Sequence, residues 1–181
     1  GKLVTSGVLL YEEINRLGNF AGRILSNPKK TMVIAGGAKV SDKMQILKQF
    51  VETGVQIIFI GGKMANSFLL AKQQKDMLKP FSVKTIPDKL ISTDINENQE
   101  IINDIALAEK IIDLAEDKKV SILLPDDYKV VTEFKSISFE NKQSPDFTKE
   151  LQLDLGEKTI YQFEDNLKGI ENVFWNGPLG A

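Results

Sequence analysis

The sequence predicts an α/β fold in which a mostly parallel β-sheet is covered by helices on both faces. Along the first 125 residues, apolar side chains alternate between helical spacing and short continuous runs. The continuous runs are apolar at almost every position, as in strands that are buried on both faces. Strand, helix, strand, helix, strand is the order that right-handed crossovers need to build a parallel sheet.

The first elements each end at a recognisable stop signal. A helix is predicted over residues 10–24, where apolar residues recur every three or four positions, and it stops before Pro28. A buried strand at 32–35 ends in a Gly-Gly pair, and a helix at 40–51 is closed by Gly54.

The later elements repeat this alternation. A second buried strand ends in another Gly-Gly pair, and a third is stopped by a proline. Between residues 128 and 154 the pattern is weak and indicates at most short strands away from the main sheet. The remaining predicted strands are 55–60, 120–124, 130–131, 137–139 and 172–175. The remaining predicted helices are one that follows the second Gly-Gly pair and ends at residue 70, and two at 101–115 and 156–167.

Composition excludes several classes of function. With 181 residues, 42% of them hydrophobic, the chain can bury one substantial core. The net charge of −2 argues against nucleic-acid binding. The chain contains no cysteine and no histidine, which excludes disulfides, thiolate or imidazole metal sites and a histidine base. The most apolar stretch, 55–70, is interrupted by Gly-Gly-Lys, and no signal-peptide pattern opens the sequence, so we expect a cytoplasmic protein without a membrane partner.

In open α/β sheets, ligands bind beyond the carboxyl ends of the strands, and the segment GGAKVSDK at 36–43 lies at such an end. Its glycines allow a close approach of the backbone, and the start of the following helix favours an anion. Lys39 and Lys43 are four residues apart, which would place them on one helix face, where they could bind a phosphate. A glycine turn with two solvated lysines is an equally supported interpretation.

Three further segments follow predicted strands. GGKMAN at 61–66 could accept the face of a nucleobase with Met64 as a wall, although a tight turn is the simpler explanation. LPDD at 124–127 could hold Mg²⁺, but a charged turn or helix cap is favoured. WNGPLG at 175–180 offers Asn176 as donor and acceptor, or forms only a structural turn covered by its tryptophan.

In this order and at these spacings, the four segments resemble the phosphoglycerate kinase family, over residues 6–178. GGAKVSDK and WNGP are highly specific for it, and GGxMAxxFL and LPxD add to them. The resemblance implies a Rossmann-like, three-layer α/β/α domain that binds MgADP or MgATP. It also implies a two-domain glycolytic kinase that reversibly transfers the acyl phosphate of 1,3-bisphosphoglycerate to ADP.

The resemblance also implies roles for individual residues. Lys39 would be the catalytic lysine that stabilises the phosphoryl group in transfer, and Lys43 would hold the phosphates of the nucleotide. The remaining residues implied at the nucleotide are Gly37 and Ala38 lining the site, Gly61 and Gly62 flanking adenine, Asn176 near the phosphates and Pro178 packed against the nucleotide.

The sequence departs from the family pattern at three positions. Lys63 replaces a small residue and Gln152 replaces a glycine beside the adenine, which puts the shape of the base pocket in doubt. Asp126 replaces a usual valine, so we expect this extra carboxylate to be solvated.

By the same resemblance, residues 1–181 are an incomplete nucleotide-binding domain without the substrate domain that would bind 3-phosphoglycerate. The glycine-rich loop with the metal-binding aspartate is also absent, so no metal ligand is assigned here. We therefore expect a monomer without turnover of its own, and an unusually exposed Trp175.

Two other classes of protein remain as alternatives. A receiver-like signalling domain also has a parallel sheet with carboxylates and a lysine at strand ends, but its acidic pair follows the first strand. A non-catalytic α/β interaction module would use the Gly-Gly turns only for packing. Binding of ADP separates the kinase from both.

Overall fold

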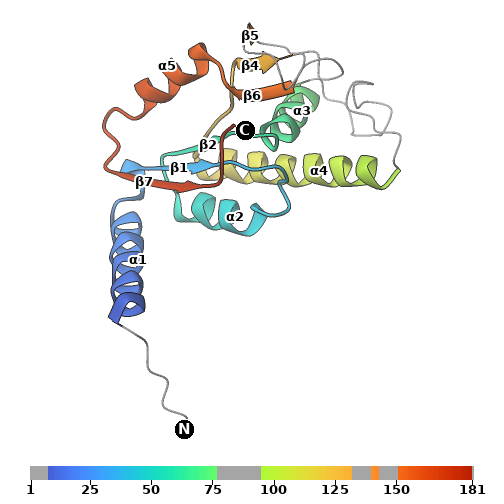
Figure 1. Ribbon diagram of the computed structural model, residues 1–181. Helices are drawn as coiled ribbons and strands as arrows, with labels where there is room; N and C mark the ends of the chain where they lie inside the picture. The colour runs from blue at the N-terminus through green and yellow to red at the C-terminus, as the bar shows by residue number, and fades with distance from the viewer. Residues whose placement is uncertain (1–7, 77–94, 132–139, 143–150, 181) are drawn as a thin grey trace.

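A computed structural model describes residues 8–76, 95–131, 140–142 and 151–180 (Figure 1). Its centre is a four-stranded sheet in the order β3-β2-β1-β7, and every neighbouring pair in it is parallel. The strands are β1 (Thr31–Ala35), β2 (Ile57–Ile60), β3 (Ser121–Leu123) and β7 (Asn172–Asn176). The predicted parallel sheet is therefore confirmed.

The two central strands bury both of their faces, which explains their continuous apolar sequence. Val33 and Ala35 of β1 contribute to one core cluster, and Met32 and Ile34 contribute to another on the opposite face. Successive side chains of a strand point to opposite faces, so each central strand needs a cover on both sides.

Helices supply these covers. The helices α2 (Met44–Thr53), α3 (Ala65–Asp76) and α4 (Ile95–Lys118) pack on the face of Val33, and residues around α5 (Glu157–Asn166) pack on the face of Met32. Figure 1 shows α2 and α5 on opposite sides of β1 and β7. The three-layer α/β/α arrangement is confirmed. The helix α1 (Val8–Ser26) extends away from the sheet and joins β1 through a short 3-10 helix, η1 (Pro28–Lys30).

A second, antiparallel sheet interrupts the parallel pattern in the region where the sequence is weakly periodic. It has the order β5-β4-β6, formed by β4 (Tyr128–Val131), β5 (Glu140–Lys142) and β6 (Leu151–Leu155). The short strand predicted at 130–131 belongs to β4, whereas the one predicted at 137–139 lies outside the described residues.

The edge strand β7 carries the tryptophan that we expected to be exposed. Trp175 is 60% exposed, and its indole N–H donates to the carbonyl of Gly177 at 2.8 Å. The tryptophan therefore braces the following turn from outside and is not a core residue. No helix among the described residues has the length and apolar character needed to cross a membrane.

Candidate functional site

The carboxyl ends of the three strands β1, β2 and β7 coincide. Ala35, the last residue of β1, is in register with Ile60 of β2 and with Asn176 of β7. The chain leaves all three strands at one edge of the sheet, so the loops that begin at Gly36, Gly61 and Gly177 start side by side. The LPDD segment leaves β3 at this edge as well, because Leu123 of β3 is in register with Phe59 of β2. All four segments singled out from the sequence therefore start at one edge of the sheet.

Backbone hydrogen bonds join the three loops to one another. The Gly36 amide donates to the carbonyl of Asn176 at 2.9 Å, and the Met64 amide donates to the carbonyl of Gly37 at 3.0 Å. The Gly62 amide donates to the carbonyl of Leu179 at 3.1 Å. The backbone of each loop is therefore fixed by a neighbouring loop.

Glycine is required where these loops cross. Gly62 has φ +67°, and a Cβ there would stand 2.7 Å from the carbonyl oxygen and 2.8 Å from the nitrogen of Gly37. A Cβ on Gly36 would overlap the carbonyl of Pro178, and Gly177 adopts φ +94° against Gly36. Side chains at these positions would force backbone apart from backbone.

Lys43 places a positive charge at this edge. Its ammonium donates to the side-chain oxygen of Asn176, which links the loop after β1 to the end of β7. Asn176 is neutral and does not balance this charge. Among the described residues no carboxylate forms an ion pair with Lys43. Within the described parts of the chain, the charge of this half-buried lysine is therefore uncompensated.

Lys39 has a different environment, and the prediction that both lysines share one helix face is wrong. The helix α2 begins at Met44, so Lys39 and Lys43 precede it in irregular backbone and turns. The Lys39 ammonium lies 2.7 Å from the carboxylate of Glu100 on α4. The hydrogen bond that the ammonium donates to this carboxylate, together with the negative charge of Glu100, raises the pKa of Lys39.

The second Gly-Gly segment differs from expectation in one respect. Met64 is fully buried within the core, so its side chain does not form a wall beside the glycines. Leu179 lies against Gly61 instead, where a Cβ would overlap its side chain. Lys63 is exposed, and Gln152 of β6 is in register with Val130 of β4.

The LPDD segment is used to hold a helix. Both carboxylate oxygens of Asp127 accept hydrogen bonds at the start of α5: one from the Lys158 amide at 3.1 Å, the other from the Thr159 amide at 2.8 Å and its hydroxyl at 2.7 Å. Asp126 contacts Lys158 at 3.0 Å and Gln162 at 2.6 Å. This is the capping interpretation. Asp126, which we expected to be solvated rather than catalytic, remains 37% exposed in its surface pair with Lys158.

Asp127 should make stability depend on pH. Burial acts to raise the pKa of Asp127, but hydrogen bonds from Thr159 and Lys158 and the charge of Lys158 together lower it below its usual 3.8. The ionised form therefore stabilises the fold above about pH 4, and this contribution is lost as the pH falls through the lowered pKa. We expect Asp127→Asn to lower the free energy of unfolding at pH 7 by about 1–2 kcal/mol.

Urea denaturation at pH 7 and pH 3 tests this expectation. The difference in stability between the wild type and Asp127→Asn should shrink at pH 3. An equally large difference at both pH values would contradict the role of the ionised carboxylate. Asp117→Asn, on the exposed end of α4, is the matched control and should change little at either pH.

Sequence reasoning missed two residues of α4 that reach the loop after β1. Glu100 pairs with Lys39, and Asp104 accepts hydrogen bonds from the amides of Val40 at 2.9 Å and Ser41 at 3.0 Å. A signal for Asp104 was present, because helical spacing places it on the same buried stripe as Ile105 and Ala108.

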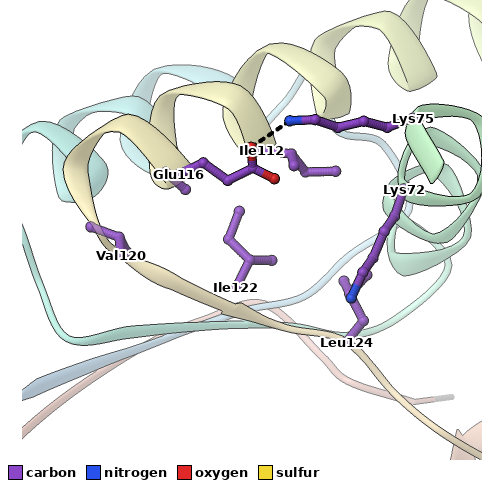
Figure 2. Close-up of a pocket in the computed structure, with 8 residues that line it drawn as sticks. Lys72, Lys75, Ile112, Glu116, Val120, Ile122 and Leu124 are labelled. Atoms are coloured by element: carbon purple, nitrogen blue, oxygen red, sulfur yellow. Dashed lines mark hydrogen bonds and ion pairs between the residues drawn. The ribbon is translucent and has the colours of Figure 1, made fainter. Parts of the chain in front are cut away.

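A cavity of about 200 Å³ lies away from the loops, between α3, α4 and β3 (Figure 2). None of the predicted site residues lines it. Figure 2 shows Lys75 reaching across to Glu116, and Asp113 and Glu116 together raise the pKa of Lys75 to about 12. The cavity and the edge formed by the glycine loops are separate features of the molecule. Within the described parts of the chain, no cluster of three or more acidic, histidine or cysteine side chains is arranged to hold a metal ion.

Comparison with known proteins supports the resemblance found in the sequence. The family model for phosphoglycerate kinase matches residues 2–181. Phosphoglycerate kinase of Lacticaseibacillus casei strain BL23 is 36% identical over 182 residues, covering 99% of this chain and 39% of that protein. The cytosolic phosphoglycerate kinase of Trypanosoma congolense is 32% identical, covering 97% of this chain and 37% of that protein.

A solved structure gives the same result for the fold. The phosphoglycerate kinase of Coxiella burnetii superimposes with a TM-score of 0.68 at 26% identity, over 97% of this chain and 40% of that one. The chain thus spans 39% and 37% of the lengths of these two curated relatives.

Proposed function

This chain belongs to the phosphoglycerate kinase family, and from this membership we propose that it forms the nucleotide-binding part of such a kinase and binds MgADP and MgATP. The observation that carries the proposal is the interlocked set of loops at the carboxyl edge of the sheet, with the charge of Lys43 held between them. A parallel sheet binds its ligands at this edge.

The lysines suit the phosphates of the nucleotide. Lys43 is held in place by the neutral Asn176 and pairs with no carboxylate of the residues that the structure describes, so an anionic phosphate would gain a charge-assisted contact. Lys39 lies four residues earlier in the same loop and would act on the phosphoryl group in transfer. Its pair with Glu100 leaves the two side chains 48% and 59% exposed, and such a pair is worth little, so a phosphate can compete for the ammonium.

The glycines suit the rest of the nucleotide. Gly37 and Ala38 are exposed or half-buried in the loop after β1, where their backbone is open to a ligand. Gly61 and Gly62 would flank the adenine, and Pro178, which is exposed next to them, would pack against the nucleotide. Gly37, Ala38, Gly62 and Pro178 are half-buried or exposed and keep the edge accessible, whereas Gly61 is buried against Leu179.

The proposed reaction is phosphoryl transfer between 1,3-bisphosphoglycerate and ADP. The bond between phosphorus and the acyl oxygen breaks, a bond from phosphorus to the terminal phosphate oxygen of ADP forms, and the carboxylate of 3-phosphoglycerate is released. Such a transfer needs positioning and charge stabilisation more than a strong base. Lysines on a rigid loop can supply both in a chain without histidine.

Mg²⁺ would enter with the phosphates of the nucleotide and reduce their charge. We assign no residue of this chain to it, because Asp126 and Asp127 are committed to α5. We further propose that 3-phosphoglycerate is bound by a second domain of the whole kinase, that the chain alone does not turn over, and that it acts as a cytoplasmic monomer.

Calorimetric titration of this chain with MgADP tests the proposed function. Lys43→Ala should raise the Kd for MgADP roughly tenfold, which corresponds to about 1.4 kcal/mol. Lys48→Ala is the matched control, since it removes a lysine from the exposed face of α2, where Lys48 pairs with Glu52 at 3.7 Å. The control should bind like the wild type. Equal losses in both variants would reduce the role of Lys43 to general electrostatic attraction.

A further inference from the structure

The carboxylate of Asp104 holds the loop that carries the two lysines. Asp104 is 8% exposed, and its two oxygens accept hydrogen bonds from consecutive backbone amides, Val40 at 2.9 Å and Ser41 at 3.0 Å. Burying a carboxylate is costly unless its oxygens are hydrogen-bonded. Both oxygens of Asp104 are used, and both bonds go to backbone, so they fix the path of the chain itself.

The amides of Val40 and Ser41 lie in the loop ahead of α2, which begins only at Met44. The Val40 side chain is fully buried in the core. The buried amide of Val40 is therefore one that needs a partner within the protein. Asp104 on α4, 64 residues later in the chain, supplies this hydrogen-bond partner.

The loop is thereby tied at both ends. On one side, the Gly36 amide is bonded to Asn176 and the Gly37 carbonyl to Met64; on the other, Val40 and Ser41 are bonded to Asp104. Ala38 and Lys39, between the two ties, remain exposed. A short loop fixed at both ends presents its central residues in one place.

The neighbouring carboxylate on the same helix acts differently. Glu100, one turn before Asp104, pairs with the ammonium of Lys39, and that pair is exposed to solvent. A ligand can take the ammonium away from Glu100 at little cost. The bond from Val40 to Asp104 is buried and that from Ser41 is partly buried, and both come from backbone amides, so neither depends on where the side chain of Lys39 lies.

We propose that Asp104 is a positioning residue for phosphoryl transfer: it holds the backbone of Val40 and Ser41 so that the lysines on either side, Lys39 and Lys43, meet the phosphates in a fixed geometry. The inference rests on the proposed function, because it assumes that this loop contacts a nucleotide. It adds a residue of α4, outside the sequence motifs, to the machinery of the site.

Asp104→Asn tests the inference in a full-length kinase that contains this chain. Asparagine has the same size but puts an N–H₂ group opposite one backbone N–H, so one of the two bonds is lost. We expect kcat to fall roughly ten- to a hundredfold, as small misplacements of reacting groups do. Exchange of the Val40 and Ser41 amide hydrogens should also become faster in this chain.

The control variant is Asp113→Asn, which removes an exposed carboxylate of α4 that pairs with Lys75 at 2.7 Å. It should leave kcat unchanged. All variants are assayed at a temperature where circular dichroism shows them folded, and Asp104→Glu, whose longer side chain displaces the carboxylate, serves as a second variant that should also lose kcat.

The outcomes separate the inference from the proposed function. If the wild-type kinase turns over and Asp104→Asn is less stable but keeps its kcat, Asp104 is only structural and the inference is wrong. If the wild-type chain does not bind MgADP and the kinase containing it does not turn over, the proposed function fails, and this inference fails with it.

Discussion

Replacing Lys39 by alanine in a full-length kinase that contains this chain should lower kcat by two orders of magnitude or more. Lys39 lies on a loop tied down at both ends and keeps its proton, because Glu100 raises its pKa. In the proposed role, the Lys39 ammonium contacts the phosphoryl group during transfer, while the negative charge of that group is redistributed. Loss of one such electrostatic contact typically costs about 3 kcal/mol of transition-state stabilisation.

The same substitution should change nucleotide affinity far less, because an interaction made chiefly in the transition state affects kcat rather than binding. Steady-state assays and MgADP titrations on Lys39→Ala and Lys43→Ala provide the comparison, with Lys48→Ala as the common control. A near-normal kcat in Lys39→Ala would show that Lys39 contributes only to the electrostatic binding of phosphate.

Gly36→Ala should destabilise the protein by about 3 kcal/mol, near the upper end for overpacking. A Cβ at this position would overlap the carbonyl of Pro178, and that neighbour is backbone, which cannot rotate away. The substitution should also weaken MgADP binding, because the loops after β1 and β7 would be forced apart. Urea denaturation followed by circular dichroism measures the first effect, and calorimetry measures the second.

Gly22→Ala, on α1, is the matched control for this prediction. No heavy atom lies within 4 Å of a Cβ at Gly22, and alanine is the better helix former, so stability should stay equal or rise by roughly 0.5–1 kcal/mol. If Gly36→Ala were as stable as Gly22→Ala, the close crossing of the loops would not exist in solution.

The sequence allowed prediction of the elements whose side chains face the core. Strands β1 and β2 are uninterrupted apolar runs because both of their faces are covered, and each ends in glycines because the next loop crosses a neighbour. Once these strands are parallel, their loops must meet at one edge. The proximity of Gly36, Gly62 and Asn176 therefore followed from local pattern alone.

Features that depend on distant partners could not be predicted in this way. The start of α2 is delayed to Met44 where Asp104, far along the chain, binds the preceding amides. The role of Asp127 depends on Thr159, which approaches it only when α5 packs on the sheet. Neither the local spacing of lysines nor a pair of aspartates carries information about such partners.

NMR titration of the ¹⁵N-labelled chain with MgADP decides whether the interlocked loops form a nucleotide site. Saturable shifts should appear in the amides of residues 36–43, 61–62 and 176–177, which lie together at the edge of the sheet. Shifts concentrated around the separate cavity between α3, α4 and β3, or no shifts at millimolar MgADP, would mean that the loops are not the nucleotide site.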